Sequence, residues 1–594
     1  MAFVLLFKLL MGSAAVATGL TVQRCPPKFE LVRRGQTIST AERKYTSQRR
    51  EHVLPDAFSA YLSNVKGTGV ALPSYVDSIL ESRDKLPNVG LSISGGGHRA
   101  ALFGAGVINA LDARNASSVR KGTGGLLQAI SHIAGLSGGS WTVTSLAQAN
   151  FPTIQKLIFG DGENYGGWIT ELDLRAPAQD PVKQTEYVQQ LLGEITVKAK
   201  HFPVSAGDIW GRTLARHFTN GTTLANFFTN GTHGSGILLS DLIKLPTFAS
   251  HLQPLPHITI NLASKHITGP SFPAGSLKLL PLNTPMFEAN LFEFGSYDDA
   301  LAAHTPLKYL GTTNNSICVQ GFDEAMFITA TTSNPFLLFN ITANILAANT
   351  ANYTTFINQT FPQSPNIRLD TNNYPNPFFG VAPETFADSE ETILAMCDGG
   401  LDGQITPYQP MLVKEREIDV IIGVDAANDV PENYAVGASL IATQQRMQIF
   451  AEGLATFPSV PASLDVFASQ SLLSRPAFFG CTPSTPSSQK PTGPIVVYLA
   501  NGAPPRDGSA PLTNTSSFQF IYPEEQIQGM LAQTFTIATQ GARIGDSLED
   551  PEWAACLACA VVDRERERGG IKRSGVCDSC FTRYCWLEEG RELA

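Results

Sequence analysis

The stretch HIAGLSGGSW (residues 132–141) places Ser137 in the spacing Gly-x-Ser-x-Gly. A serine in this pattern can act as the nucleophile of an ester hydrolase when it lies between a strand and a helix. The spacing alone is weak evidence, because a chain with 51 glycines in 594 residues produces it by chance. Residues 126–134 can form a strand, residues 135–139 a sharp turn, and a helix can follow from Ser140. This context predicts a nucleophile elbow, with the amino end of the helix favouring negative charge.

A second strand–turn–helix unit lies upstream, in SISGGGHRAALFGAGVINAL (residues 92–111). Its three glycines expose backbone N–H groups at the start of a helix and can bind an anion. Residues 95–100 satisfy the dinucleotide pattern Gly-x-Gly-x-x-Ala, which requires an acidic residue about twenty positions further on. Residues 113–160 contain no Asp or Glu, so this interpretation lacks its ribose partner. The alternative is an oxyanion hole, with Arg99 holding a substrate anion beside it.

A serine nucleophile needs a base. The last of the ten histidines is His304, so a triad in the order Ser-Asp-His would have to be complete by that position. None of the histidines lies in a clear strand-end turn, and we expect His132 in a strand or the core and His98 in a loop. The segment CDGGLDGQITP (residues 397–407) offers Asp398, followed by two glycines in a turn that can hold its carboxylate rigidly. A Ser–Asp dyad is chemically sound if burial keeps the aspartate poised to accept a proton, although Asp-Gly-Gly is more often an ordinary turn.

Apolar runs in the sequence predict the β-strands that must position these residues. Several runs are continuous rather than alternating, as expected of a sheet that is covered on both faces. They are VGLSIS (89–94), HITINLA (257–263), IDVIIGVD (418–425) and PIVVYLA (494–500). Helical patterns such as residues 100–113 separate them. We therefore predict an α/β fold with one extended catalytic body.

Composition excludes some classes of function. The chain is 43% hydrophobic and 16% charged, which is typical of a globular protein. Its formal charge of −10 argues against a nucleic-acid partner, which would need a basic surface. The densest basic run, residues 564–573, is interrupted by glutamates. We find no repeats, and the nearest segment to a linker, residues 481–494, is predicted to be a surface loop.

The amino end, MAFVLLFKLLMGSAAVATG, predicts a secretory signal peptide over residues 1–17, with a short buried helix as the alternative. No other stretch is long enough to span a membrane, and the carboxyl end CWLEEGRELA lacks the apolar tail that precedes a lipid anchor. We expect a secreted, extracellular protein, which the cell wall or periplasmic space can retain. Sequons modestly support glycosylation. They lie at Asn115, Asn220, Asn230, Asn314, Asn340, Asn352, Asn358 and Asn514.

Five of the nine cysteines fall in the last forty residues. The pattern CLAC, seventeen residues, CDSC has the spacing of a four-thiolate zinc site. A secreted chain enters an oxidising compartment, however, so we favour disulfides that pin the cysteine-rich segment 553–586 to the body. An odd number leaves at least one cysteine free or bonded elsewhere, and the pairing cannot be read from the sequence.

The motifs SGGGHR, GLSGG and DGG, in this order, resemble those of lipid acyl hydrolases with a Ser–Asp dyad, of the patatin-like and cytosolic phospholipase A2 types. The sequence is most similar to the fungal phospholipase B (lysophospholipase) family. The resemblance covers nearly the whole chain. It includes residues 25–45, GDIWGRTLARHF (207–218), FEANLFEFGSYD (287–298), CVQGFDEAMFITATTS (318–333) and the cysteine-rich tail.

The resemblance implies that Ser137 is the nucleophile and Asp398 its base. It assigns the oxyanion-hole amides to Gly96 and Gly97, and the lipid phosphate to Arg99. It also implies a central mixed sheet covered by helices, a single large catalytic domain over residues 18–594, and disulfides rather than zinc at the tail.

Two departures from the family pattern stand out. An aromatic residue is usual where this chain has His98, and V-D-G-G-x-D-G is usual where it has Cys397 and Leu401. The cysteine beside the predicted base can be paired or free. This leaves the pairing of Cys397 open and does not affect the predicted dyad.

The expected chemistry is hydrolysis of fatty-acyl esters of phospholipids and lysophospholipids, at membrane or micelle surfaces, through an acyl-enzyme. We expect no metal, no cofactor and no stable protein partner. Residues 234–248 and 334–340 can form an apolar mouth, or they can be ordinary core. Two alternatives remain: a hydrolase of non-phosphorylated lipids, and a catalytically silent, lipid-binding secreted glycoprotein, against which the intact motifs speak.

Overall fold

The structure is a computed structural model that describes residues 20–272, 280–337, 367–450, 452–481, 493–541 and 549–587. The predicted signal peptide (1–17) and most of the predicted loop 481–494 lie outside these residues. So do the sequons at Asn340, Asn352 and Asn358.

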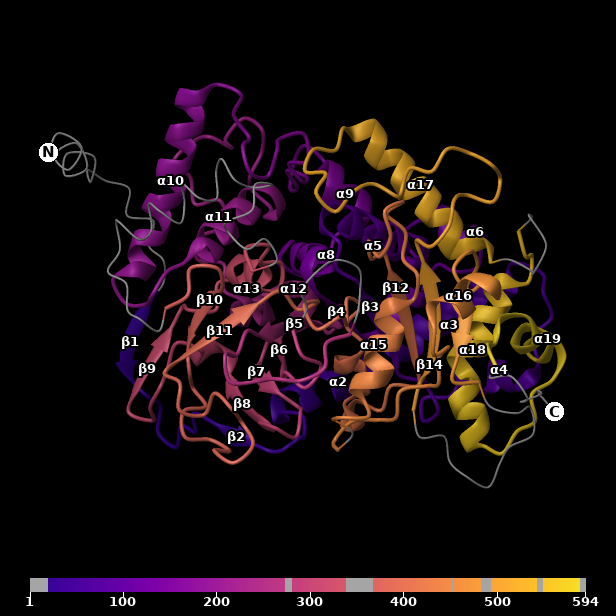
Figure 1. The fold of residues 1–594 in the computed structure, drawn as a ribbon. Coiled ribbons are helices and arrows are strands. Elements are labelled where there is room, and N and C mark those ends of the chain that lie inside the picture. Colours follow the sequence, from indigo (N-terminus) through magenta and orange to yellow (C-terminus); the bar gives the residue numbers. More distant parts are fainter. Residues whose placement is uncertain are drawn as a thin grey trace, which may run out of the picture.

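A mixed β-sheet forms the centre of the molecule (Figure 1). Along the sheet the strands are β13 (Ala477–Phe479), β14 (Ile495–Ala500), β12 (Val420–Asp425), β3 (Val89–Ile93), β4 (Ile130–Gly135), β5 (Leu255–Leu262), β6 (Met286–Asn290), β7 (Glu293–Ser296), β8 (Ala303–Pro306) and β2 (Arg33–Arg34). The strands β10 (Asn372–Pro375) and β11 (Ile393–Cys397) join it through β5, and β1 (Thr21–Arg24) pairs separately with β9 (Ile317–Gln320).

The middle of the sheet is parallel and the flanks are antiparallel. Strands β14, β12, β3, β4 and β5 run in the same direction. Strands β6, β8 and β13 run opposite to them, and β7, which is antiparallel to both β6 and β8, runs with them. Every residue of β3, β4, β12 and β14 is buried. This burial explains the continuous apolar runs in the sequence, because helices cover both faces of the parallel part.

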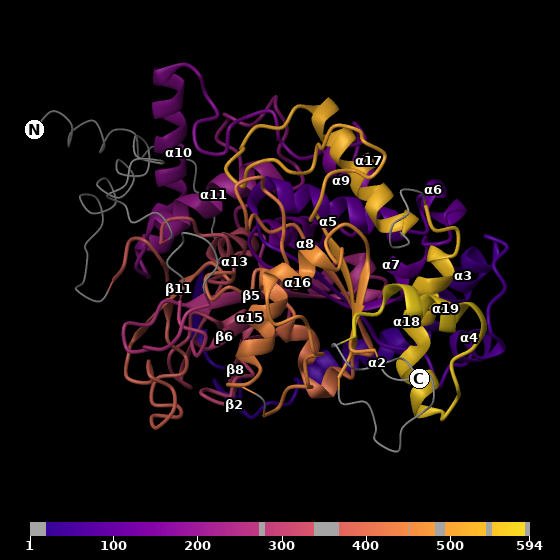
Figure 2. The ribbon, with the colours of Figure 1, turned by 45° about the vertical axis from the view of Figure 1, so that its right-hand side comes forward.

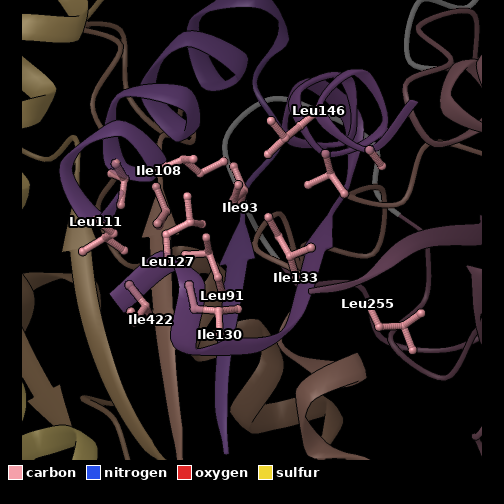
Figure 3. Packing of buried hydrophobic residues seen from close by; sticks show 14 of the residues in the cluster. Leu91, Ile93, Ile108, Leu111, Leu127, Ile130, Ile133, Leu146, Leu255 and Ile422 are labelled. Atoms are coloured by element: carbon pink, nitrogen blue, oxygen red, sulfur yellow. The ribbon is translucent and has the colours of Figure 1, made fainter. Parts of the chain in front are cut away.

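Alternate side chains of β12 and β14 enter two different cores. In β12, Val420, Ile422 and Val424 belong to the larger core, and Ile421 belongs to the smaller one on the opposite face. Figure 3 shows α5 and α8 packed over β3 and β4, with Ile108 and Leu146 above the strands. The helices α15 and α16 cover the other face (Figures 1 and 2).

Most helices lie on the face of the larger core. They include α3 (Leu54–Lys66), α4 (Ser74–Leu80), α5 (Gly97–Leu111), α7 (Leu126–Ala129), α8 (Ser137–Gln148), α9 (Ile154–Phe159), α11 (Ala206–Phe218), α13 (Ala325–Thr332), α17 (Glu524–Gln540), α18 (Trp553–Arg568) and α19 (Gly575–Tyr584). The smaller core is closed by α15 (Ala438–Arg446) and α16 (Leu464–Ser469). Helices α2 (Thr40–His52) and α12 (Pro246–Ala249) add Tyr45 and Phe248 to the larger core, and the remaining helices are α6 (Ala116–Arg120) and α10 (Pro181–Ala199).

Disulfides pin the carboxyl-terminal segment to the body, as predicted. Among the described residues the pairs are Cys25–Cys318, Cys481–Cys585, Cys556–Cys580 and Cys559–Cys577. The last two join α18 to α19, which lie side by side in Figure 2. The zinc alternative is therefore wrong, because the four cysteines with zinc-ribbon spacing are paired with one another. Cys397 is a free, buried thiol.

No helix in the described part of the chain combines the length and the apolar character needed to cross a membrane.

Candidate active site

Ser137 occupies a tight turn between β4 and α8. Its φ is 46°, in the left-handed region that is costly for a residue with a Cβ. Ser137 remains partly exposed, whereas its neighbours Leu136 and Gly138 are buried. A strained, accessible serine between a strand and a helix has the geometry of a nucleophile elbow.

The structure corrects the predicted boundaries around this turn. Residues 126–129 form the short helix α7, and the strand begins only at Ile130. The run Leu-Leu-Gln-Ala consists of good helix formers, and an apolar run of this length fits either element. The following helix begins at Ser137 rather than at Ser140.

Glycines bring the two predicted turns into direct contact. A Cβ added to Gly138 would lie 2.0 Å from the carbonyl oxygen of Gly97, and one added to Gly139 would lie 2.3 Å from that of Ile93. A Cβ added to Gly95 would lie 2.9 Å from the Cβ of Ser137. No larger residue fits these positions without moving backbone, so the glycines set the distance between the serine and the glycine-rich loop.

The sheet topology brings Asp398 to the same place. Strand β4 pairs with β5 only as far as the pair Gly135–Ile258. Beyond this point β11 takes over the same edge of β5, with Cys397 opposite Asn261, because β6 occupies the other edge. Strands β4 and β11 therefore end beside each other, and the residues that follow them meet.

The Asp398 carboxylate lies close to the Ser137 hydroxyl, which lowers the pKa of this carboxylate. The Gly400 N–H donates to its Oδ1 at 2.8 Å. Asp398 is only 8% exposed, and this burial raises its pKa to about 7. The Gly400 N–H and the Ser137 hydroxyl act against this shift, and the Asp402 charge adds a smaller raising effect. A carboxylate with a pKa near neutrality is suited to accept the serine proton and return it.

Gly96 and Gly97 lie where an oxyanion hole is needed. They have φ angles of 132° and 65°, values that favour glycine, and both are partly exposed. They open α5, and the first N–H groups of a helix have no intrahelical partner. Their amides and the amino end of α5 can stabilise an oxyanion that forms at Ser137.

Arg99 lies beside this loop but is fully buried. Its Nη1 donates to the carbonyl oxygen of Asn433 and its Nη2 to that of Ala426, each at 2.5 Å. Burial lowers its pKa to about 10, so the group stays cationic. The guanidinium is thus near the predicted oxyanion hole, but both terminal nitrogens already have partners in the segment that follows β12.

The prediction that His98 lies in a loop is wrong. This residue is in α5, and its ring is fully buried against Trp141, Phe218 and Tyr522. Burial lowers its pKa to about 3, so the ring is neutral. The neutral ring packs as an aromatic side chain among these three neighbours.

His132 is in β4, as predicted, and forms part of a buried polar cluster. Glu42, His132 and His257 have ligand atoms within 4.8 Å of one another, the spacing of a metal site in the described part of the chain. The His132 Nδ1 and His257 Nε2 already share a hydrogen bond of 2.9 Å, and the Glu42 carboxylate accepts from Arg416 and Asn290. These internal partners account for the cluster, and we assign no metal to it.

The predicted apolar mouth is partly core. Leu239, Leu242, Phe248 and Phe336 are buried in the larger core, and Ile243 is 38% exposed. The last three residues of the segment 334–340 lie outside the described residues. Ordinary core packing accounts for these four buried side chains, and a mouth formed by the rest stays a prediction.

The described sequons lie at accessible positions. Asn230 and Asn314 are exposed, and Asn115, Asn220 and Asn514 are partly exposed. Their glycosylation stays a prediction.

Fold and site together define the class of the protein, an ester hydrolase of mixed α/β architecture. A family model described as "Lysophospholipase catalytic domain" matches residues 89–590. The chain is 32% identical to a lysophospholipase of Penicillium chrysogenum, over 95% of this chain and 89% of the relative. It is 34% identical to lysophospholipase 1 of Candida albicans, over 97% and 91%. The chain belongs to the lysophospholipase family.

A solved structure shares the fold. The human GIVD cytosolic phospholipase A2 matches with a TM-score of 0.62 at 15% identity, over 92% of this chain and 72% of that one. The predicted fold class is thereby confirmed, as is the predicted family.

Proposed function

We propose that this protein hydrolyses the fatty-acyl ester bonds of lysophospholipids and phospholipids through a Ser137–Asp398 dyad. One observation carries the proposal: a partly exposed, strained serine lies close to a buried carboxylate, beside the glycine amides that open α5. The family membership supports the reaction class.

The proposed reaction has two halves. The Ser137 oxygen attacks the ester carbonyl while Asp398 takes its proton, and the amides of Gly96 and Gly97 stabilise the oxyanion. Collapse of this intermediate expels the glycerol oxygen, which takes the proton from Asp398 and leaves the acyl group on the serine. Asp398 then takes a proton from water, the hydroxide attacks the acyl-enzyme, and the fatty acid leaves as Ser137 regains its proton.

In this proposal Arg99 steadies the phosphate of the head group. The guanidinium must first exchange at least one of its bonds to the Ala426 and Asn433 carbonyls. The same observation favours a second candidate, hydrolysis of lipids that carry no phosphate, in which Arg99 keeps these two bonds and serves the loop alone.

The proposal includes work at the surface of micelles or membranes and secretion from the cell. Secretion is supported by the amino-terminal signal pattern and by the disulfides of the described residues, since disulfides persist in oxidising compartments. We propose that Asn230 and Asn314 are glycosylated.

The test is release of fatty acid from lysophosphatidylcholine micelles without calcium, comparing wild type with Ser137→Ala. Ser131→Ala is the matched control, because Ser131 is buried in β4 and its hydroxyl has no hydrogen-bond partner within the described residues. We expect the wild type and the control to be active and Ser137→Ala to be silent. Equal activity of all three overturns the dyad, whereas a wild type that cleaves only phosphate-free esters favours the second candidate.

A further inference from the structure

Thr332 lies between the two halves of the dyad. It is the last residue of α13 and is fully buried. Its Oγ1 accepts a hydrogen bond from the backbone N–H of Ser137 at 3.2 Å and donates one to the carbonyl oxygen of Thr259 at 2.5 Å. Its own carbonyl oxygen accepts from the N–H of Gly399 at 3.2 Å. One residue thus contacts the backbone of the nucleophile and that of the loop that carries the base.

The loop of the base is packed directly against this hydroxyl. A Cβ added to Gly399 would lie 2.9 Å from the Thr332 Oγ1 and 2.3 Å from the Thr259 carbonyl oxygen. The Asn261 side-chain amide donates to the Gly399 carbonyl oxygen at 3.0 Å. Residues of β5 and α13 therefore hold Gly399 from two sides, and Asp398 is adjacent to it.

The hydroxyl also explains how the Ser137 turn is kept in place. A left-handed serine persists only where its surroundings hold it, and the N–H of Ser137 has the Thr332 hydroxyl as its acceptor. A threonine hydroxyl has one proton to donate, and here that proton is directed at Thr259. The donor role fixes the orientation of the hydroxyl, so that a lone pair faces Ser137.

We propose that Thr332 is a positioning residue of the hydrolytic reaction, which fixes the Ser137 turn and the Asp398 loop relative to each other. This inference rests on the proposed dyad. Thr332→Val preserves the shape of the side chain and removes both hydroxyl hydrogen bonds. Since a displacement of about 1 Å in a catalytic group costs on the order of 100-fold in rate, we expect kcat to fall about 10- to 100-fold with KM unchanged. Thr332→Ser keeps the hydroxyl and is expected to restore kcat.

The preceding residue provides a matched control. Thr331 is equally buried, but its hydroxyl donates to the Phe327 carbonyl oxygen and shares a hydrogen bond with the Tyr374 hydroxyl. Thr331→Val therefore makes the same chemical change one position away from the dyad contacts. We expect it to lower the thermal midpoint and to leave kcat unchanged.

The experiment measures kcat and KM on lysophosphatidylcholine, the rate of inactivation by a fluorophosphonate ester, and the thermal midpoint, for all three variants. A selective loss of kcat and of inactivation rate in Thr332→Val, reversed in Thr332→Ser, supports the inference. Equal losses in Thr332→Val and Thr331→Val overturn it. If Thr332→Val does not fold, Thr332→Ser is compared with Thr332→Ala, and equal kcat in these two overturns it as well. Activity of Ser137→Ala in the same assay refutes the dyad itself. If Ser137→Ala is inactive, a negative result with the Thr332 variants refutes only the positioning role of Thr332.

Discussion

Replacing Gly138 by alanine inserts a single methyl group between the two turns that form the site. The added Cβ would lie 2.0 Å from the carbonyl oxygen of Gly97, where real Cβ contacts start at 3.0 Å. The backbone must therefore open by at least 1.0 Å, which is 3.0 minus 2.0. The atom that must move belongs to the predicted oxyanion hole, so we expect kcat to fall on the order of 100-fold, with overpacking costing about 1–3 kcal/mol of stability.

Gly193→Ala is the control for this substitution. Gly193 is exposed in the middle of α10, with no atom within 4 Å of an added Cβ. Alanine there is expected to add about 0.5–1 kcal/mol of stability and to leave activity unchanged. Fatty-acid release and thermal unfolding are measured on both variants. Full kcat in Gly138→Ala would refute the argument that contact between the two turns sets the geometry of the oxyanion hole.

Three further predictions concern charge and burial at the site. Asp398 must be deprotonated to act as a base, and burial raises its pKa to about 7. We therefore expect kcat/KM to rise with pH through about 7 and to be about 100-fold lower at pH 5 than on the alkaline plateau. A flat profile from pH 5 to 8 contradicts this role. Arg99→Ala is expected to lose more activity on lysophosphatidylcholine than on a monoacylglycerol, whereas equal losses would argue against a phosphate contact. His98→Phe is expected to stabilise the fold by about 1–3 kcal/mol, because both ring nitrogens lack partners among the described residues. The pKa of His98 is about 3 in the folded protein and 6.5 in the unfolded chain. As the pH falls below 6.5 the unfolded state therefore binds the proton first, and the stability of the wild type decreases. A thermal midpoint for His98→Phe at or below that of wild type from pH 7 to 4 would contradict the argument.

The sequence predicted the parts of the site that depend on local chemistry. The glycines around Ser137 and before His98 announce turns, and continuous apolar runs predict β3, β5, β12 and β14 within a few residues of their observed bounds. Asp398 was predicted because two glycines follow it in a turn and no histidine lies in a clear strand-end turn, and the resemblance to a family motif supported it. Its approach to Ser137 depends on β11 taking the free edge of β5, and no local pattern encodes that pairing.

Other features could be seen only in three dimensions. Thr331 and Thr332 are adjacent and chemically identical, and only the packing of α13 directs one hydroxyl to Tyr374 and the other to Ser137. The partners of the cysteines likewise depend on tertiary contacts, since Cys481 pairs across the fold with Cys585. Arg99 was predicted as an anion ligand from its position after the glycines, and its two carbonyl partners come from a segment that follows a distant strand.

The central claim is that the Ser137 oxygen becomes covalently acylated during turnover. A fluorophosphonate ester with a long alkyl chain traps such a serine permanently, and peptide mapping by mass spectrometry locates the adduct. We predict one adduct, on the peptide that contains Ser137, with its formation slowed by lysophosphatidylcholine and abolished in Asp398→Asn. Loss of activity with Ser137 unmodified, or an adduct on another residue, would contradict the account.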